Sequence, residues 1–140
     1  MYHTIIAVGN LGRDPEMRYT PEGQAVTNFS VACNRQYKGK DGRLIKETIW
    51  FRVSTWGNTA ENCNKYLKRG SKVLVEGRLI PDFNTGGPKI WNRQDGTPAA
   101  SFEINALTVR FLSSRSEDDA SAPEQDHEEP EQDATDDIPF

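Results

Sequence analysis

Residues 44–56 combine aromatic and cationic side chains along a segment patterned as a β-strand. Because strand side chains point alternately to two faces, one face is apolar and is expected to be core: Ile45, Ile49, Phe51 and Val53. The opposite face carries Lys46, Trp50, Arg52, Ser54 and Trp56. Two indoles and two cations on the solvent side of a strand require a covering partner. The pattern predicts a ligand that offers flat rings for stacking and negative charge for pairing.

Two further stretches place an aromatic ring beside cations. Tyr37 precedes Lys38 and Lys40 in a hairpin with its tip at Asp41-Gly42, and Trp91 lies close to Lys89. Single-stranded nucleic acid fits this combination, since each unpaired base stacks for about 1–3 kcal/mol and cations neutralise the phosphates. We predict the following stacking residues: Tyr37, Trp50, Trp56 and Trp91. The alternative is that Trp50 and Trp56 fill a subunit interface or a satellite core.

Charge divides the chain into two segments. Residues 1–112 hold sixteen Lys/Arg against ten Asp/Glu, a net charge of +6, whereas residues 113–140 hold eleven Asp/Glu against Arg115, a net charge of -10. The first segment has the charge sign of a polyanion binder. The second is too acidic and too poor in apolar residues to form a core, so it is predicted to be disordered. The sequence predicts one binding domain over 1–112 and a tail over 113–140.

The last five residues join carboxylates to an apolar tip: Asp136, Asp137, Ile138, Pro139 and Phe140. A ring and a terminal carboxylate at Phe140 could fill an apolar pocket beside a cation on another protein. The tail would act as a tether that raises the local concentration of that partner. We interpret the tip as a partner-binding site, because a disordered chain rarely ends in this way by accident; an accidental ending is the alternative.

The order of elements predicts a small barrel. The sequence indicates three strands, a helix and two strands, with a short additional strand around Trp91. Asn58 is expected to cap the helix with Glu61, and Leu79 is expected to point inward. A one-residue slip of the apolar phase near Ala106 predicts a bulge. The fold class is therefore an all-β protein with one helix, an OB-fold five-stranded Greek-key barrel.

Several classes of function are disfavoured by composition. Cys33 and Cys63 fit neither a disulfide framework nor a metal site, and the two histidines are too few for one; we expect no metal, no cofactor and no catalytic residues. Absence of a long apolar run or a signal-like start suggests no membrane segment and a cytoplasmic location. An RNA-binding OB module stays open as an alternative, since stacking does not separate DNA from RNA. A purely structural oligomer would leave the outward tryptophans without a role.

Motifs along most of the chain resemble the bacterial single-stranded DNA-binding protein family. They include Val8-Gly9-Asn10-Leu11-Gly12, Asp14-Pro15-Glu16 with Arg18-Tyr19, Trp50-Phe51-Arg52-Val53, Trp56-Gly57, Tyr66-Leu67-Lys68-Arg69-Gly70-Ser71, Val75-Glu76-Gly77 and the Asp-Asp-Ile-Pro-Phe end. The resemblance implies an OB-fold homotetramer that wraps single-stranded DNA near the nucleoid. It also implies that the tail tip docks on replication, recombination and repair proteins.

The resemblance assigns roles to individual residues. The family's stacking positions fall on the four aromatics given above, with Tyr37 and Trp56 where tryptophan and phenylalanine are common. Its phosphate-binding positions fall on Lys38 or Lys40, Arg52, Lys68 and Arg69, and Lys89 beside Trp91 is a further candidate. The chain departs from the pattern in residues 80–100, which are longer and richer in Gly and Pro, and in a short charged linker.

Overall fold

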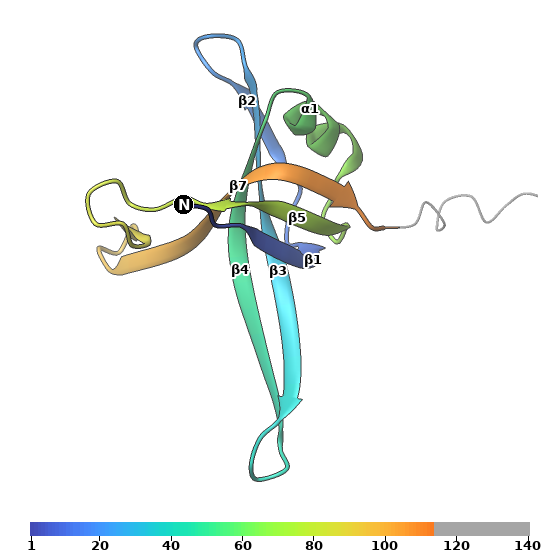
Figure 1. Cartoon of the computed structure of the whole chain (residues 1–140), viewed down its shortest axis with the longest axis vertical. Coiled ribbons are helices and arrows are strands. Elements are labelled where there is room, and N and C mark those ends of the chain that lie inside the picture. The colour runs from blue at the N-terminus through green and yellow to red at the C-terminus, as the bar shows by residue number, and fades with distance from the viewer. Residues whose placement is uncertain (114–140) are drawn as a thin grey trace, which may run out of the picture.

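The computed structural model describes residues 1–113, and the predicted tail with its tip lies outside the described residues. Seven strands and one helix make up this part (Figure 1): β1 Ile5–Leu11, β2 Glu16–Tyr19, β3 Ala25–Lys38, β4 Leu44–Trp56, α1 Gly57–Tyr66, β5 Lys72–Leu79, β6 Lys89–Asn92 and β7 Pro98–Phe111. The predicted class, all-β with one helix, is confirmed.

Five of the strands close into a barrel. Hydrogen bonding runs in the order β1-β5-β7-β4-β3, and β3 returns to β1 at Asn10↔Ala32 and Leu11↔Val31. The β4–β7 pair is parallel and the other pairs are antiparallel. With α1 between the third and fourth barrel strands, this is the predicted OB topology. β2 extends the sheet beyond β3, and β6 pairs with the start of β7.

The core fills the barrel and continues under the helix. Its buried members come from all five barrel strands and from α1 and its end: Ala7, Leu11, Phe29, Val31, Val53, Cys63, Leu67, Val73, Val75, Ile104 and Ala106. Two buried threonines connect the helix to the strands, because the Thr27 hydroxyl donates to the Ala60 carbonyl at 2.6 Å and the Thr55 hydroxyl donates to the Thr27 carbonyl at 3.0 Å. The first bond holds α1 against β3, and the second connects β4 to β3.

The β3–β4 hairpin continues far beyond the barrel as a two-stranded arm (Figure 1). Its pairing runs without a break from Val26↔Trp56 to Lys38↔Leu44. Ile45 and Ile49, expected in the core, are therefore exposed by 39% and 44%, and complete burial on this strand face begins only at Val53. Alternation gives the face of a strand, but it does not show where the covering layer ends.

Three smaller predictions can also be compared with the structure. The bulge near Ala106 is confirmed, because the register jumps from Glu76↔Thr108 to Gly77↔Ala106 and leaves Leu107 unpaired. Leu79 is 42% exposed, so its inward assignment was wrong. Asn58 was also wrong as the helix cap: the N-cap is Trp56, without a side-chain hydrogen bond. The short strand β2 was not predicted.

Candidate nucleic-acid interface

The outer face of the β3–β4 ribbon positions the two central indoles. Residues paired directly across antiparallel strands share a face, and here Val26 faces Trp56, Ser30 faces Arg52 and Ala32 faces Trp50. Trp50 and Trp56 therefore lie on one face with Arg52 between them, at intervals of roughly 6.6 Å for every second residue. The two residues are 52% and 42% exposed. Neither indole is sealed inside the protomer.

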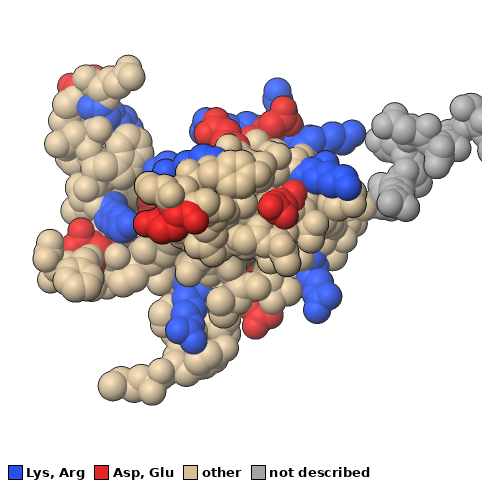
Figure 2. Space-filling view, turned by 90° about the horizontal axis from the view of Figure 1, so that it is seen from above, with Lys and Arg blue, Asp and Glu red and all other residues tan. Residues whose placement is uncertain are grey.

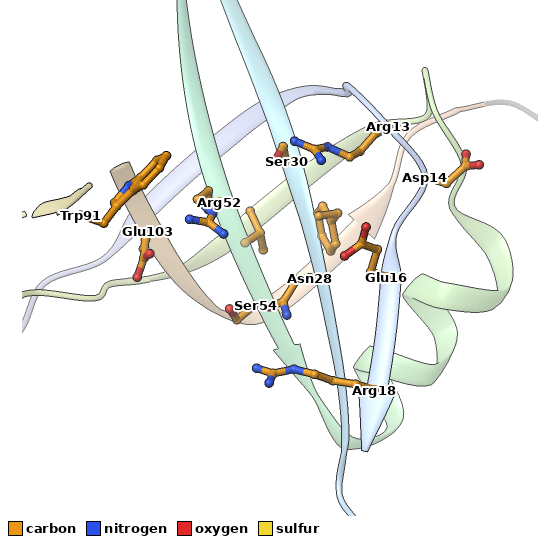
Figure 3. A pocket seen from close by; sticks show the side chains of 12 residues that line it. Arg13, Asp14, Glu16, Arg18, Asn28, Ser30, Arg52, Ser54, Trp91 and Glu103 are labelled. Carbon is orange, nitrogen blue, oxygen red and sulfur yellow. Dashed lines mark hydrogen bonds between the residues drawn. The ribbon is translucent and has the colours of Figure 1, made fainter. Parts of the chain in front are cut away.

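A groove with a volume of about 520 Å³ lies on this face. Figure 3 shows Arg13 and Arg18 extending from the β2 side toward β3 and β4, with Arg52 and Trp91 on the other side. The remaining lining residues are Asp14, Glu16, Asn28, Phe29, Ser30, Val53, Ser54 and Glu103. The fold thus brings Arg52 and Trp91, which are 39 positions apart in sequence, to one cavity.

The three arginines of the groove are available to a ligand. Within residues 1–113, the ion pairs are Arg35–Glu47, Arg43–Asp41 and Lys89–Glu103, so none involves Arg13, Arg18 or Arg52. Two of the carboxylates in the lining are engaged elsewhere: Glu103 pairs with Lys89 at 3.5 Å, and Asp14 accepts a hydrogen bond from the Arg69 backbone amide at 2.8 Å. Free guanidinium groups in a groove suit phosphate, which they bind bidentately.

Positive charge is not gathered into one uninterrupted patch. Figure 2 shows Lys and Arg side chains spread over the face viewed from above, with Asp and Glu side chains between them. The distribution favours a path of separate cationic contacts over a single deep anion site. Such a path suits an extended polyanion, whose charges recur along its length.

Each indole has its own support from the protein. The Trp56 indole N–H donates to Asn105 Oδ1 at 3.1 Å, and the Trp91 indole N–H donates to Ser101 Oγ at 3.0 Å. The Trp50 ring lies over Gly12, where an added Cβ would be 2.6 Å from Cζ3. These contacts restrict rotation of the rings. A ligand that stacks on them therefore causes a smaller loss of side-chain conformational entropy.

Not every predicted site residue joins this face. Tyr37 pairs with Ile45, so it lies on the other face of the arm, where the Arg35 guanidinium stacks 4.8 Å from its ring centroid. Lys38 and Lys40 are at the far end of the arm, both exposed. The fold therefore separates Tyr37 from Trp50, Trp56 and Trp91 within one protomer.

The other predicted cations lie beside the groove. Lys68 and Arg69 are exposed in the turn after α1, and the bond from the Arg69 amide to Asp14 ties that turn to the groove's edge. Lys89 is held by its ion pair with Glu103, so a phosphate there would compete with a carboxylate. A phosphate at Lys68 or Arg69 meets no such competition within residues 1–113.

Sequence reasoning missed several groove residues. Arg13 and Arg18 lie on the two sides of the Asp14-Pro15 turn, and this segment was used above only as part of a family motif. Their positions on both sides of a turn could have indicated a short returning strand with cations at each end. Asn28, Ser30 and Ser54 were also missed as lining residues, although the alternation had already placed Ser54 outward.

Features for other chemistry are sparse in residues 1–113. His, Cys, Asp and Glu side chains form no group of three or more that could hold a metal ion there. Burial raises the pKa of the Cys63 thiol to about 11, and desolvation also raises the pKa of Cys33. Thiols with raised pKa values are poor nucleophiles at neutral pH. No helix in this part has the length and apolarity to cross a membrane.

Curated proteins similar to this chain are single-stranded DNA-binding proteins. The one from Wolinella succinogenes is 39% identical over 115 residues, and the one from Helicobacter hepaticus is 38% identical over the same length. Both matches cover 82% of this chain, but only 67% and 64% of the respective relatives. The chain thus spans about two thirds of the length of these relatives.

Solved structures share the fold. The small single-stranded DNA-binding protein from Streptomyces coelicolor matches with a TM-score of 0.64 and 25% identity, covering 78% of this chain and 93% of that one. A Plasmodium falciparum SSB in complex with ssDNA matches with a TM-score of 0.66 and 24% identity, covering 81% and 97%. The model of the single-strand binding protein family matches residues 2–112. The chain belongs to the single-strand binding protein family.

Proposed function

We propose that this protein binds single-stranded DNA without catalysing a reaction and largely independently of sequence. The observation that carries the proposal is the outer face of β4, where Trp50 and Trp56 flank Arg52 beside a groove that also holds Arg13 and Arg18. Stacking accepts any base because every base has a π-face, while guanidinium groups follow the phosphates. The names of its relatives favour DNA over the RNA alternative.

The wider role is part of the same proposal. Residues 1–112 would protect single strands during replication, recombination and repair in the cytoplasm, at the nucleoid, and the protein would act as a homotetramer. Tyr37, Lys38 and Lys40 on the arm and Lys68 and Arg69 beside the groove would extend the DNA path. The acidic tail, residues 113–140, would bring partner proteins to that DNA through Asp136, Asp137, Ile138, Pro139 and Phe140.

Tryptophan fluorescence provides the test of DNA binding. Titration with oligo-dT should quench the emission strongly, because all three tryptophans of the chain belong to the predicted stacking set. Trp50→Ala should reduce the quench and weaken binding roughly 5- to 150-fold, the equivalent of one stacked base. Oligo-rU measured in parallel tests the RNA alternative. Unchanged emission at saturating oligo-dT would refute the proposed stacking.

The tail tip and the assembly need separate experiments. Phe140→Ala should leave oligo-dT affinity nearly unchanged and abolish retention of replication or repair proteins on DNA-bound protein. If the variant retains those proteins, the tip is not the docking site. Sedimentation of the full chain with and without oligo-dT measures the oligomeric state directly, and a monomer under both conditions would exclude the tetramer.

A further inference from the structure

Strand β7 lies between β6 and β4 and shares one outer face with both. Lys89 on β6 is opposite Ser101, and Arg52 on β4 is opposite Glu103. Residues opposite one another in a sheet point to the same side, and Ser101 and Glu103 are two positions apart on β7. Glu103 therefore lies on one face with Lys89 and Arg52, which come from the strands on either side of it. Figure 3 shows Glu103 on this side of the groove, together with Trp91 and Arg52.

The outer face of β7 supports the binding surface with hydrogen-bond acceptors, and one of them is charged. Ser101 Oγ accepts from the Trp91 indole N–H, and Asn105 Oδ1 accepts from the Trp56 indole N–H. Glu103 lies between these two uncharged acceptors on the same strand. Its side chain is only 19% exposed, so water screens its charge less than that of a fully exposed carboxylate. Uncharged groups suffice as acceptors on this face, so the negative charge of Glu103 needs a separate explanation.

The charge of Glu103 masks Lys89. Lys89 Nζ is 3.5 Å from Glu103 Oε2. A second carboxylate also faces Lys89: the pKa of Asp82 is lowered, first by hydrogen bonds from the Asn84 and Thr85 backbone amides and to a smaller extent by the Lys89 charge. Counterions are released from DNA only when a protein cation neutralises a phosphate. An ammonium group that carboxylates already neutralise contributes little to this release.

We propose that Glu103 limits the affinity of the groove for DNA, a proposal that rests on the proposed DNA binding. The carboxylate neutralises Lys89 and repels phosphates that approach Arg52 on the neighbouring strand. Bound DNA is then released faster than the rings and guanidinium groups of this face would allow without it. Lys89 is a latent phosphate-binding residue, which becomes available when the charge of Glu103 is removed.

Glu103→Gln measures this limit, because glutamine keeps the length of the side chain and its acceptor oxygen and removes only the charge. Lys89 can then neutralise one phosphate of a single-stranded ligand. The slope of log affinity against log salt should become steeper by about 0.7. Relative to 1 M salt, that slope corresponds to an affinity gain of about threefold at 0.2 M salt and about eightfold at 0.05 M salt. Most of the gain should appear as slower release.

The experiment uses the full chain and a short, fluorescently labelled oligo-dT. Anisotropy titrations over a range of salt concentrations give the affinity and its slope, and displacement by excess unlabelled oligo-dT gives the release rate. Lys89→Gln should weaken binding and keep the wild-type slope, because it unmasks the carboxylate and removes a cation that made no phosphate contact. The double variant Glu103→Gln/Lys89→Gln should return to the wild-type slope. Glu61→Gln makes the same change on the exposed surface of α1, outside the groove lining, and should keep the wild-type slope and release rate.

The outcomes separate this inference from the function on which it depends. If the wild-type protein does not bind oligo-dT, both are wrong. If it binds and a folded Glu103→Gln protein binds no more tightly, DNA binding stands and the role of Glu103 is overturned. An equal gain in Glu61→Gln also overturns it, because net charge alone would then explain the effect.

Lys89→Gln gives a second test, which does not require Glu103→Gln to fold. A slope that is shallower by about 0.7 in Lys89→Gln would show that Lys89 already contacts a phosphate, and the masking would be overturned. A slope as steep in the double variant as in Glu103→Gln would overturn it too. A steeper slope and slower release in Glu103→Gln, both absent from the double variant and from Glu61→Gln, support the proposal.

Discussion

Replacement of Gly12 by alanine tests whether packing of the Trp50 ring over Gly12 (the Trp50 seat) matters for DNA binding. An added Cβ would lie 2.6 Å from Trp50 Cζ3 and 2.7 Å from Cη2. Carbon atoms prefer a separation of at least about 3.5 Å, so the ring must move by about 0.9 Å. Trp50 is 52% exposed, so its ring can move outward, and we expect a stability loss of less than about 1 kcal/mol, a few degrees in Tm.

The displaced ring should bind DNA less well than the seated one. Complete loss of one stacked base costs about 1–3 kcal/mol, or roughly 5- to 150-fold in affinity. Because Gly12→Ala moves the ring without removing it, we expect a roughly five- to tenfold loss of oligo-dT affinity, smaller than that of Trp50→Ala. Fluorescence titration measures the affinity, and circular dichroism on heating measures Tm.

Gly87→Ala provides the matched control, because a Cβ there would meet only Thr85 Oγ1, at an ordinary 3.7 Å. Its affinity should equal that of the wild type. An unchanged affinity in a folded Gly12→Ala protein would refute the proposed role of the Trp50 seat. So would an equal loss in both variants, since it would show that the steric contact with Trp50 is irrelevant.

Three other predictions concern charge and pH. Arg52→Ala should lower the slope of log affinity against log salt by about 0.7 for each phosphate that the guanidinium neutralises, and an unchanged slope would exclude such a phosphate. Removal of residues 114–140, which carry a net charge of -10, should strengthen oligo-dT binding at low salt; equal affinities would show that the tail does not compete with DNA. The third concerns Cys63, whose pKa is raised from 9.0 to about 11 by burial. Above pH 9 the unfolded thiol ionises first, so folding stability should fall between about pH 9 and 11 by an order of 2–3 kcal/mol. Urea unfolding should show this loss in the wild type and not in Cys63→Ala, and identical pH profiles would contradict it.

Local pattern was sufficient for the outward direction of the indoles. Side chains of a strand alternate between two faces, and the face that holds Phe51 and Val53 is the apolar one. Trp50 and Trp56 are on the other face, so they had to point away from the core. The order of strands and helix, and the phase slip at Ala106, were enough to predict the barrel and its bulge. The charge division at residue 112 also needs no structure, since it is a property of composition.

Only the tertiary structure determined where along a strand burial ends and which residues distant in sequence lie close together. Ile45 and Ile49 keep the alternation of a core strand, yet no layer formed by residues 1–113 covers the arm, because the covering depends on strands far away in sequence. The groove is assembled in the same way: β2 pairs with β3 and brings Arg13 and Arg18 across from Arg52, while the β6–β7 hairpin supplies Trp91. The register of hydrogen bonds also sends Tyr37 to the opposite face. Side-chain direction is a local property of the backbone, whereas proximity depends on long-range pairing that no single segment encodes.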